Sequence, residues 1–156
     1  MRKENIHCDL SALAFDFFYW FSRFEFALKE NQYLKSHKPG SNADPGWSEY
    51  VLKWQPIYNP SAEACELLQL LPQRQIVLEG DALDWKPLNL SRCKSALDAV
   101  VLCLKTIRNN LFHGGKHSCE GWDDPMRNHA LLTSGKAVLS QLAKLGDFEA
   151  DYLRLY

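Results

Sequence analysis

The residues best suited to chemistry lie close together between positions 107 and 116 of the chain. Arg108 carries a planar guanidinium group, which can bind two phosphate oxygens at once. The imidazole of His113 ionises near neutral pH, so it can give or take a proton. Asn109, Asn110 and Lys116 add hydrogen-bonding groups around this pair. Together these side chains could bind a phosphodiester and move the protons that its cleavage requires.

RNA suits such a site because its own 2′-hydroxyl supplies the nucleophile. Its cleavage then needs neither a covalent enzyme group nor a metal ion. It needs a base for the 2′ proton, an acid for the 5′ oxygen, and positive charge beside the phosphorus. His113 can act as the base or the acid, and Arg108 can stabilise the negative charge that develops. DNA has no 2′-hydroxyl, so we expect it to resist cleavage.

A long helix that ends at the motif must position these residues. Asn89 or Ser91 could cap its start, and Gly114 followed by Gly115 suits its end. His113 would lie at or near the last helical residue, where unpaired carbonyl groups stabilise an imidazolium. The helix is predicted from apolar residues at helical spacing, namely Cys93, Leu97, Val100, Leu104, Ile107 and Leu111.

Helical geometry restricts how these residues can cooperate. Arg108 and His113 lie about 140° apart around an ideal helix, so they do not share a face. Asn109, four residues before His113, does share its face. Two copies of the helix, paired across a symmetric dimer, would bring two arginines and two histidines together in one cleft.

This motif resembles the signature of HEPN domains, in which an arginine and a histidine are separated by four to six residues. Asn109 directly after Arg108 and the helix break directly after His113 agree with that signature. The run from Trp20 to Lys29 is similar to the first helix of some HEPN proteins. These are small helical proteins, and many are metal-independent ribonucleases that act as dimers, often as toxins or antiviral effectors.

The resemblance implies a single all-α domain over residues 1–156, an antiparallel helical bundle of the HEPN type with a long loop and short-helix insertion. It implies an endoribonuclease that works at a homodimer interface without a metal or cofactor and leaves a 2′,3′-cyclic phosphate. Arg108 and His113 would be catalytic, whereas Asn109, Asn110 and Lys116 would support them or bind substrate. RNA and an antitoxin or defence-system partner are expected.

Two other interpretations remain open. One is a HEPN-like domain without catalysis, which binds RNA or another protein. The other is a purely structural helical protein, in which Arg108 is a surface cation and His113 caps the helix. Substitution of these two residues would alter neither activity nor RNA affinity in that last case.

The composition fits one globular domain, with 156 residues, 46% of them hydrophobic and 24% charged. A net charge of −1 argues against coating nucleic acid through charge alone. The aromatic run at 15–21 is too short and too interrupted by charge to span a membrane. Five cysteines without paired spacing, together with no signal peptide, predict reduced thiols in the cytoplasm.

The first half of the chain predicts further helices. A long helix with a wide apolar face is expected from about Asp9 to Leu34. Residues 35–60 should form a long loop that carries a short amphipathic helix from Trp47 to Trp54. Ser61 can cap another helix, which Pro72 would end.

The second half is less uniform. Residues 75–87 could form either a small hairpin or an extended connector. Asp123 or Asp124 should cap a helix that Gly146 ends, and Gly135 within it predicts close approach of another helix. The tail repeats apolar residues at helical spacing, so a short last helix is expected to pack there.

Several other groups have two interpretations. Trp47 and Trp54 could stack on bases, although residues of this kind more often attach a loop to a core. Arg23 and Glu25 could form an ion pair or support the site.

Metal binding is the weaker interpretation of two further groups. His113, His117 and Cys119 could contribute to a zinc site, but no fourth ligand is evident.

Two polar groups outside the motif are also open to interpretation. Arg127 and His129 could flank the motif or simply be exposed. Solvated loop charge is the better interpretation of the acidic residues Glu79, Asp81 and Asp84.

Overall fold

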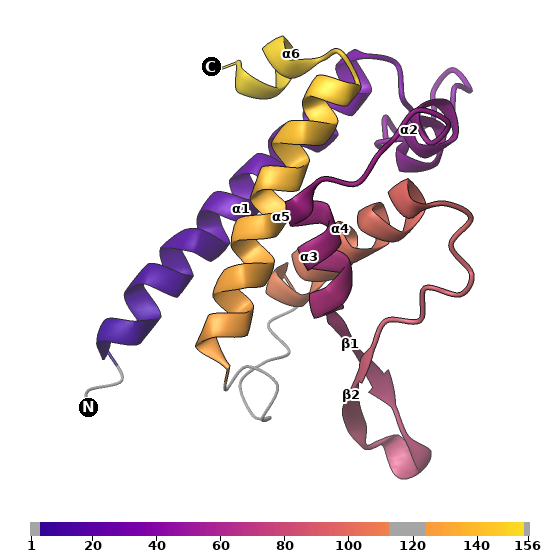
Figure 1. Ribbon diagram of the computed structural model, residues 1–156. Coiled ribbons are helices and arrows are strands. Elements are labelled where there is room, and N and C mark those ends of the chain that lie inside the picture. The colour runs from indigo at the N-terminus through magenta and orange to yellow at the C-terminus, as the bar shows by residue number, and fades with distance from the viewer. Residues whose placement is uncertain (1–3, 113–123, 155–156) are drawn as a thin grey trace.

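A computed structural model of the chain describes residues 4–112 and 124–154. This part of the chain is mostly helical, with one small antiparallel sheet of two strands (Figure 1). In chain order its elements are α1 (Glu4–Glu30), α2 (Trp47–Trp54), α3 (Ala62–Leu70), β1 (Gln73–Val77), η1 (Glu79–Asp81), β2 (Leu83–Pro87), α4 (Ala96–Phe112), α5 (Pro125–Leu145) and α6 (Glu149–Leu153). The prediction of a helical protein is confirmed at the level of fold class.

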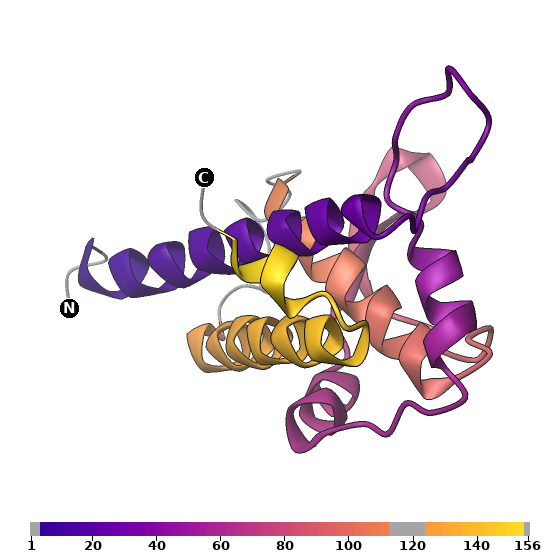
Figure 2. The same cartoon turned by 90° about the horizontal axis from the view of Figure 1, so that it is seen from above.

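The long helices α1 and α5 lie side by side and run in the same direction (Figures 1 and 2). Their direction follows from the contacts, since Asp16 pairs with Lys136 and Phe24 packs on Phe148, beyond the end of α5. The end of α4 lies beside the start of α5, since Ile107 and Leu111 line a hollow together with Leu131. The parallel course of α1 and α5 differs from the antiparallel bundle that the sequence analysis expected.

Gly135 lets α1 approach α5 closely, as the sequence predicted. A Cβ atom at this position would lie 2.8 Å from Cε2 of Phe17, a residue with no exposed surface. Leu104 of α4 lies near the same point. Three helices thus meet at one glycine, and the space for the Phe17 ring depends on its missing side chain.

An aromatic cluster joins α1 to α2 and to the C-terminal region. Phe24 stacks on Trp47 with ring centroids 4.8 Å apart and meets Tyr50 edge to face. Tyr50 has no exposed surface, and its hydroxyl donates to the carbonyl of Leu142. Trp54 donates to the hydroxyl of Tyr33. Trp47 and Trp54 therefore pack the short helix onto the core, which is the structural alternative for both residues.

Arg23 fastens the last helix to the first. Its side chain is buried, and it donates to the carbonyl groups of Asp151 and Tyr152 at 2.6 Å and 3.4 Å. Its guanidinium also lies 4.5 Å from the centroid of the Phe26 ring. Arg23 and Glu25 therefore face different partners, since Glu25 accepts a hydrogen bond from Trp47.

Several helix starts agree with the sequence, but those of α1 and α4 do not. Helix α1 runs from Glu4 to Glu30 rather than from about Asp9 to Leu34. Ser61 caps α3 and Asp124 caps α5, which begins at Pro125 and is followed by Gly146. Helix α4 begins at Ala96, and the hydroxyl of Ser95 accepts from the backbone of Asp98. The predicted cap at Asn89 or Ser91 was therefore wrong. Asn89 instead accepts from the backbone of Ser91 in a turn, and Cys93 lies outside the helix.

Residues 73–87 form the hairpin, one of the two structures that the sequence left open. Strands β1 and β2 pair with Gln75 opposite Trp85. The backbone of Leu88 donates to the carbonyl of Pro72 and closes the base of the hairpin. The hairpin projects from the helical body (Figure 1), and its acidic residues are exposed. Within the described residues, no helix has the length and apolar character needed to cross a membrane.

The Gly135 contact predicts the sign of one stability change. Alanine is favoured over glycine in a helix interior by about 1 kcal/mol, but overpacking a core costs about 1–3 kcal/mol. We expect Gly135→Ala to lower the free energy of unfolding in urea denaturation. The loss should shrink in a Phe17→Leu background, where the ring is absent. Stabilisation by Gly135→Ala in the native background would contradict the close contact.

Candidate active site at the end of helix α4

Helix α4 presents the motif in its last two turns. The described part of the helix runs to Phe112, and the predicted place of His113 at the helix end falls on the residues that follow it. His113 and Lys116 themselves lie outside the described residues, as do the remaining candidate zinc ligands. The structure therefore defines the arginine and asparagine side of the candidate site.

Arg108 points from α4 toward α1. One of its guanidinium nitrogens lies 3.8 Å from Oε2 of Glu25, and its centre lies 5.6 Å from the centroid of the Phe21 ring. Oε1 of Glu25 accepts a hydrogen bond of 3.0 Å from the indole of Trp47. The aromatic cluster thus orients the carboxylate that faces Arg108.

The ion pair between Arg108 and Glu25 contributes more to orientation than to stability. The arginine side chain is 34% exposed and the glutamate side chain 22% exposed. Partly exposed pairs at such a distance stabilise a fold by only about 0–1 kcal/mol. The guanidinium therefore stays accessible to a further anion while its direction is restricted.

Asn109 and Asn110 continue the site around the helix. Oδ1 of Asn109 accepts a hydrogen bond of 3.0 Å from Arg108. Asn110 instead donates a hydrogen bond of 2.7 Å to the carbonyl of Gln73 in β1. Three consecutive residues therefore reach from α1 to the hairpin, because each is turned by about 100° relative to the last.

A pocket opens beside these asparagines, between α4 and the hairpin. We call it the outer pocket, and its volume is about 380 Å³. Leu88 and Leu102 supply its apolar surface. Its polar and aromatic lining consists of Arg74, Gln75, Trp85, Thr106, Asn109 and Asn110. The pocket is therefore adjacent to the motif through the two asparagines.

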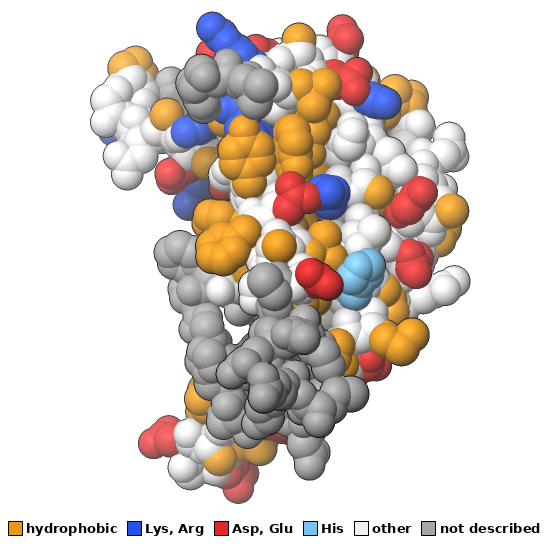
Figure 3. Space-filling view, turned by 90° about the vertical axis from the view of Figure 1, so that its left-hand side faces the viewer, with side chains coloured by type: hydrophobic (Ala, Val, Ile, Leu, Met, Phe, Trp, Pro, Cys, Tyr) orange, Lys and Arg blue, Asp and Glu red, His pale blue; other side chains and the backbone are white. Residues whose placement is uncertain are grey.

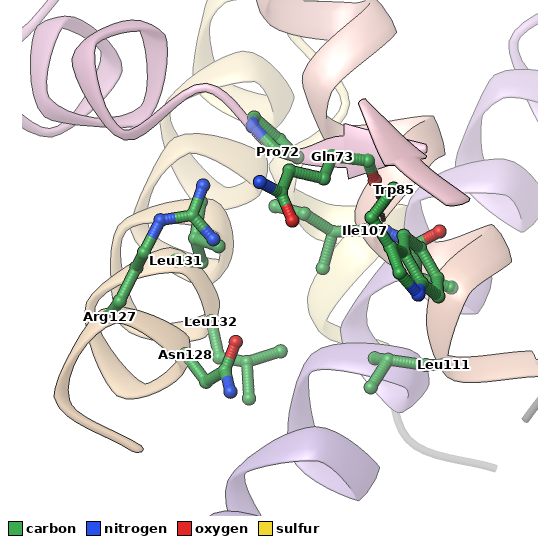
Figure 4. Close-up of a pocket in the computed structure, with 10 residues that line it drawn as sticks. Pro72, Gln73, Trp85, Ile107, Leu111, Arg127, Asn128, Leu131 and Leu132 are labelled. Atoms are coloured by element: carbon green, nitrogen blue, oxygen red, sulfur yellow. Dashed lines mark hydrogen bonds between the residues drawn. The ribbon is translucent and has the colours of Figure 1, made fainter. Parts of the chain in front are cut away.

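A smaller hollow lies nearer to α5 and shares Trp85 and Asn110 with the outer pocket. This inner hollow has a volume of about 20 Å³ and lies among Gln73, Trp85, Asn128 and Leu131 (Figure 4). Asn128 is only 2% exposed. A hollow of this size has room for roughly one water molecule, so a larger ligand is confined to the outer pocket.

Arg127 holds one side of the inner hollow in place. Its guanidinium donates to the carbonyl groups of Leu70 and Leu71 at 2.7 Å and 3.1 Å, at the end of α3. Arg127 is therefore half-buried and lines a hollow beside the motif helix. His129 is exposed and lies 3.4 Å from the hydroxyl of Thr133. Of the two interpretations that the sequence left open, Arg127 therefore lies beside the motif helix, whereas His129 is simply exposed.

Sequence reasoning missed Trp85 and Gln73. Trp85 belongs to the stretch 75–87, whose structure was left open, and Gln73 lies just before it; neither is part of a recognisable motif. The available signal was an aromatic residue beside Asp84 and Lys86 in a polar, β-prone stretch. That signal does not reveal that the tryptophan faces the end of α4.

Other chemistries find less support in the described residues. No group of three or more His, Cys, Asp or Glu side chains there could hold a metal ion. Burial raises the pKa of the Cys103 thiol to about 12, so this cysteine is not a thiolate near neutral pH. Burial also raises the pKa of Cys93. The polar groups around Arg108 are consequently the best-developed site.

Comparison of the chain with protein-family models, with curated proteins and with solved structures gives no match. The likeness to HEPN domains therefore stays a prediction from the motif.

The bond between Asn110 and Gln73 predicts a local effect on the hairpin. We expect Asn110→Ala to lose an anchor worth about 1 kcal/mol, so amide hydrogen exchange in residues 73–87 should accelerate. Exchange in the core of α1 and α5 should change little. The matched control is Asn109→Ala, because Asn109 bonds to its neighbour Arg108 rather than to the hairpin. Equal protection of the hairpin in both variants would exclude this anchoring role.

Proposed function

We propose that this protein is a metal-independent endoribonuclease of the HEPN type that acts as a homodimer. One observation carries the proposal: α4 presents Arg108 and Asn109 in its last turns and ends at Phe112, directly before His113. The sequence then adds, one residue later, an imidazole that could exchange protons beside this phosphate-binding fork. The accessibility of Arg108 supports a role in anion binding.

The proposed reaction is transfer of phosphorus to the 2′-oxygen of RNA. A histidine takes the 2′ proton as the 2′-oxygen attacks the phosphorus, and the bond from phosphorus to the 5′-oxygen breaks. An acid protonates that 5′-oxygen, which leaves a 2′,3′-cyclic phosphate and a 5′-hydroxyl. His113 from each of two protomers can supply the base and the acid. Arg108 stabilises the charge on the phosphorane, and Asn109 orients the arginine.

The apolar surface of α1 supports a dimer near the motif. Phe15 is 76% exposed, and Phe18 and Tyr19 are 37% and 42% exposed. A groove runs among Phe15, Phe18 and Leu111, and Leu111 belongs to the motif helix. Figure 3 shows hydrophobic side chains at the surface of the face that is turned to the left in Figure 1. A second copy that covered this groove would bring the two α4 ends close together.

A toxin or antiviral effector is the biological role that we propose, because uncontrolled cleavage of RNA harms the cell that makes the enzyme. Such an enzyme requires control by an antitoxin or by other components of a defence system. We propose the cytoplasm as the compartment in which it acts.

A non-catalytic module is the second candidate. The observation in its favour is that Arg108 already has an ion-pair partner in Glu25 and a ring contact with Phe21. In that case the motif would stabilise the packing of α4 on α1, and the protein would bind RNA or a partner protein without cleaving. Loss of catalysis on substitution of Arg108 or His113 distinguishes the two candidates.

The first prediction of the proposed function concerns cleavage in EDTA. We expect the wild type to cut a mixed-sequence single-stranded RNA and to spare the matching DNA. His113→Ala and Arg108→Ala should each reduce the rate by at least about 100-fold, while Arg108→Lys should recover little, because lysine lacks the planar fork.

The matched control for that assay is Lys105→Ala, which removes an exposed cation from the same helix. All variants should first be shown to be folded by circular dichroism. Equal cleavage by the wild type and His113→Ala would place the activity elsewhere. Absence of cleavage by every sample, with RNA binding retained, would favour the non-catalytic module.

The second prediction concerns the dimer. The mass of one chain is 18.0 kDa, and we expect sedimentation to give twice that mass. Phe15→Asp should shift the protein to the monomer and reduce cleavage, since a charge would be buried in the apolar contact. Leu52→Asp is the control, because Leu52 is 71% exposed on α2. A monomeric wild type that still cleaves RNA would exclude the shared site.

A further inference from the structure

The dimensions of the outer pocket set the class of ligand that it can take. Its volume of about 380 Å³ lies within the range of about 300–1,000 Å³ that is usual for small-molecule sites. The inner hollow, at about 20 Å³, is too small for anything but water. A ligand of the size of one nucleobase would therefore occupy the outer pocket.

The hairpin contributes an aromatic surface to this pocket. Trp85 of β2 pairs with Gln75 of β1, and both residues line the pocket. Directly paired residues of antiparallel strands point to the same side of the sheet. The side of the hairpin that faces α4 thus carries an indole ring beside a carboxamide. Aromatic rings at such places stack on bases of any sequence.

The opposite wall supplies further carboxamides from Asn109 and Asn110. Asn110 uses one N–H group to bond Gln73, but a carboxamide has two N–H groups and an oxygen with two lone pairs. These groups match the donors and acceptors on the edge of a base. Among the described residues, the pocket lining includes the cation Arg74 and no carboxylate, which disfavours cationic ligands and suits a nucleotide.

Asn109 connects the pocket to the proposed catalytic group. It lines the pocket and also accepts a hydrogen bond of 3.0 Å from Arg108. We propose that the outer pocket binds one base of single-stranded RNA, stacked on Trp85, next to the phosphate held by Arg108. This inference rests on the proposed function for the choice of RNA, and it assigns substrate recognition to the hairpin.

The test measures binding to an RNA analogue that cannot be cleaved. The probes are a mixed-sequence 2′-O-methyl octanucleotide and an abasic strand with the same backbone, and fluorescence anisotropy gives the dissociation constants. Trp85→Leu keeps an apolar side chain but removes the ring, whereas Trp85→Phe keeps a smaller ring. Circular dichroism and hydrogen exchange of the hairpin verify that both variants retain the fold.

We expect Trp85→Leu to weaken binding of the base-bearing probe at least about fivefold, and Trp85→Phe to recover most of the affinity. The abasic probe should bind the wild type and Trp85→Leu equally. Unchanged affinity in Trp85→Leu, an equal loss for both probes, or absence of wild-type binding to the octanucleotide would each overturn the inference.

The same variants separate this inference from the proposed function. If RNA cleavage depends on Arg108 and His113 but Trp85→Leu binds the octanucleotide like the wild type, the pocket assignment is wrong and the catalytic proposal stands. If binding depends on Trp85 but the wild type does not cut RNA in EDTA, the base pocket stands and catalysis is wrong.

Discussion

The candidate site depends on the angular spacing of successive residues around the axis of α4. Each residue of a helix is turned by about 100° from the one before it. Arg108 faces Glu25 on α1, Asn109 bonds to Arg108, and Asn110 reaches Gln73 on the hairpin. The geometry therefore holds only while α4 packs on α1 and the hairpin at once. Burial of its apolar stripe against the core fixes that position.

The packing around α4 also explains why weak polar contacts suffice at the site. Glu25 is held by the indole of Trp47, which stacks on Phe24. The Phe24 ring also contacts Phe148. Phe148 directly precedes α6, the helix that Arg23 holds against α1. Burial of the aromatic core thus offsets the conformational entropy that is lost when these side chains are ordered. The polar groups can then remain accessible without being loosely placed.

Local signals predicted the helices well and their arrangement less well. Ser61, Asp124 and Gly135 act within a few residues or at one contact, so their roles follow from sequence. Cys93 fits the apolar period of α4, yet the cap at Ser95 starts the helix later, because periodicity does not specify where capping occurs. The parallel course of α1 and α5 depends on the path of residues 31–124, which no local pattern specifies.

The candidate site was predictable to a similar degree. The motif identified Arg108 and Asn109, since their types and spacing carry the chemistry. Trp85 and Gln73 come from another part of the chain, and their position depends on the strand register and on the bond from Asn110. Such long-range placement is not encoded in a single short pattern. The pocket could therefore be recognised only in three dimensions.

The attachment of the hairpin has a consequence for how this protein can diverge. Its base is closed by the bond from Leu88 to Pro72, whereas Val77 and Leu83 near its tip are 67% and 58% exposed. Sequence changes near the tip disturb little of the helical core. Changes of length or composition there need not alter the bond from Asn110 to Gln73 at the start of β1. The tip of the hairpin and the motif helix are thus separable parts of the structure, and a substitution in one leaves the packing of the other in place.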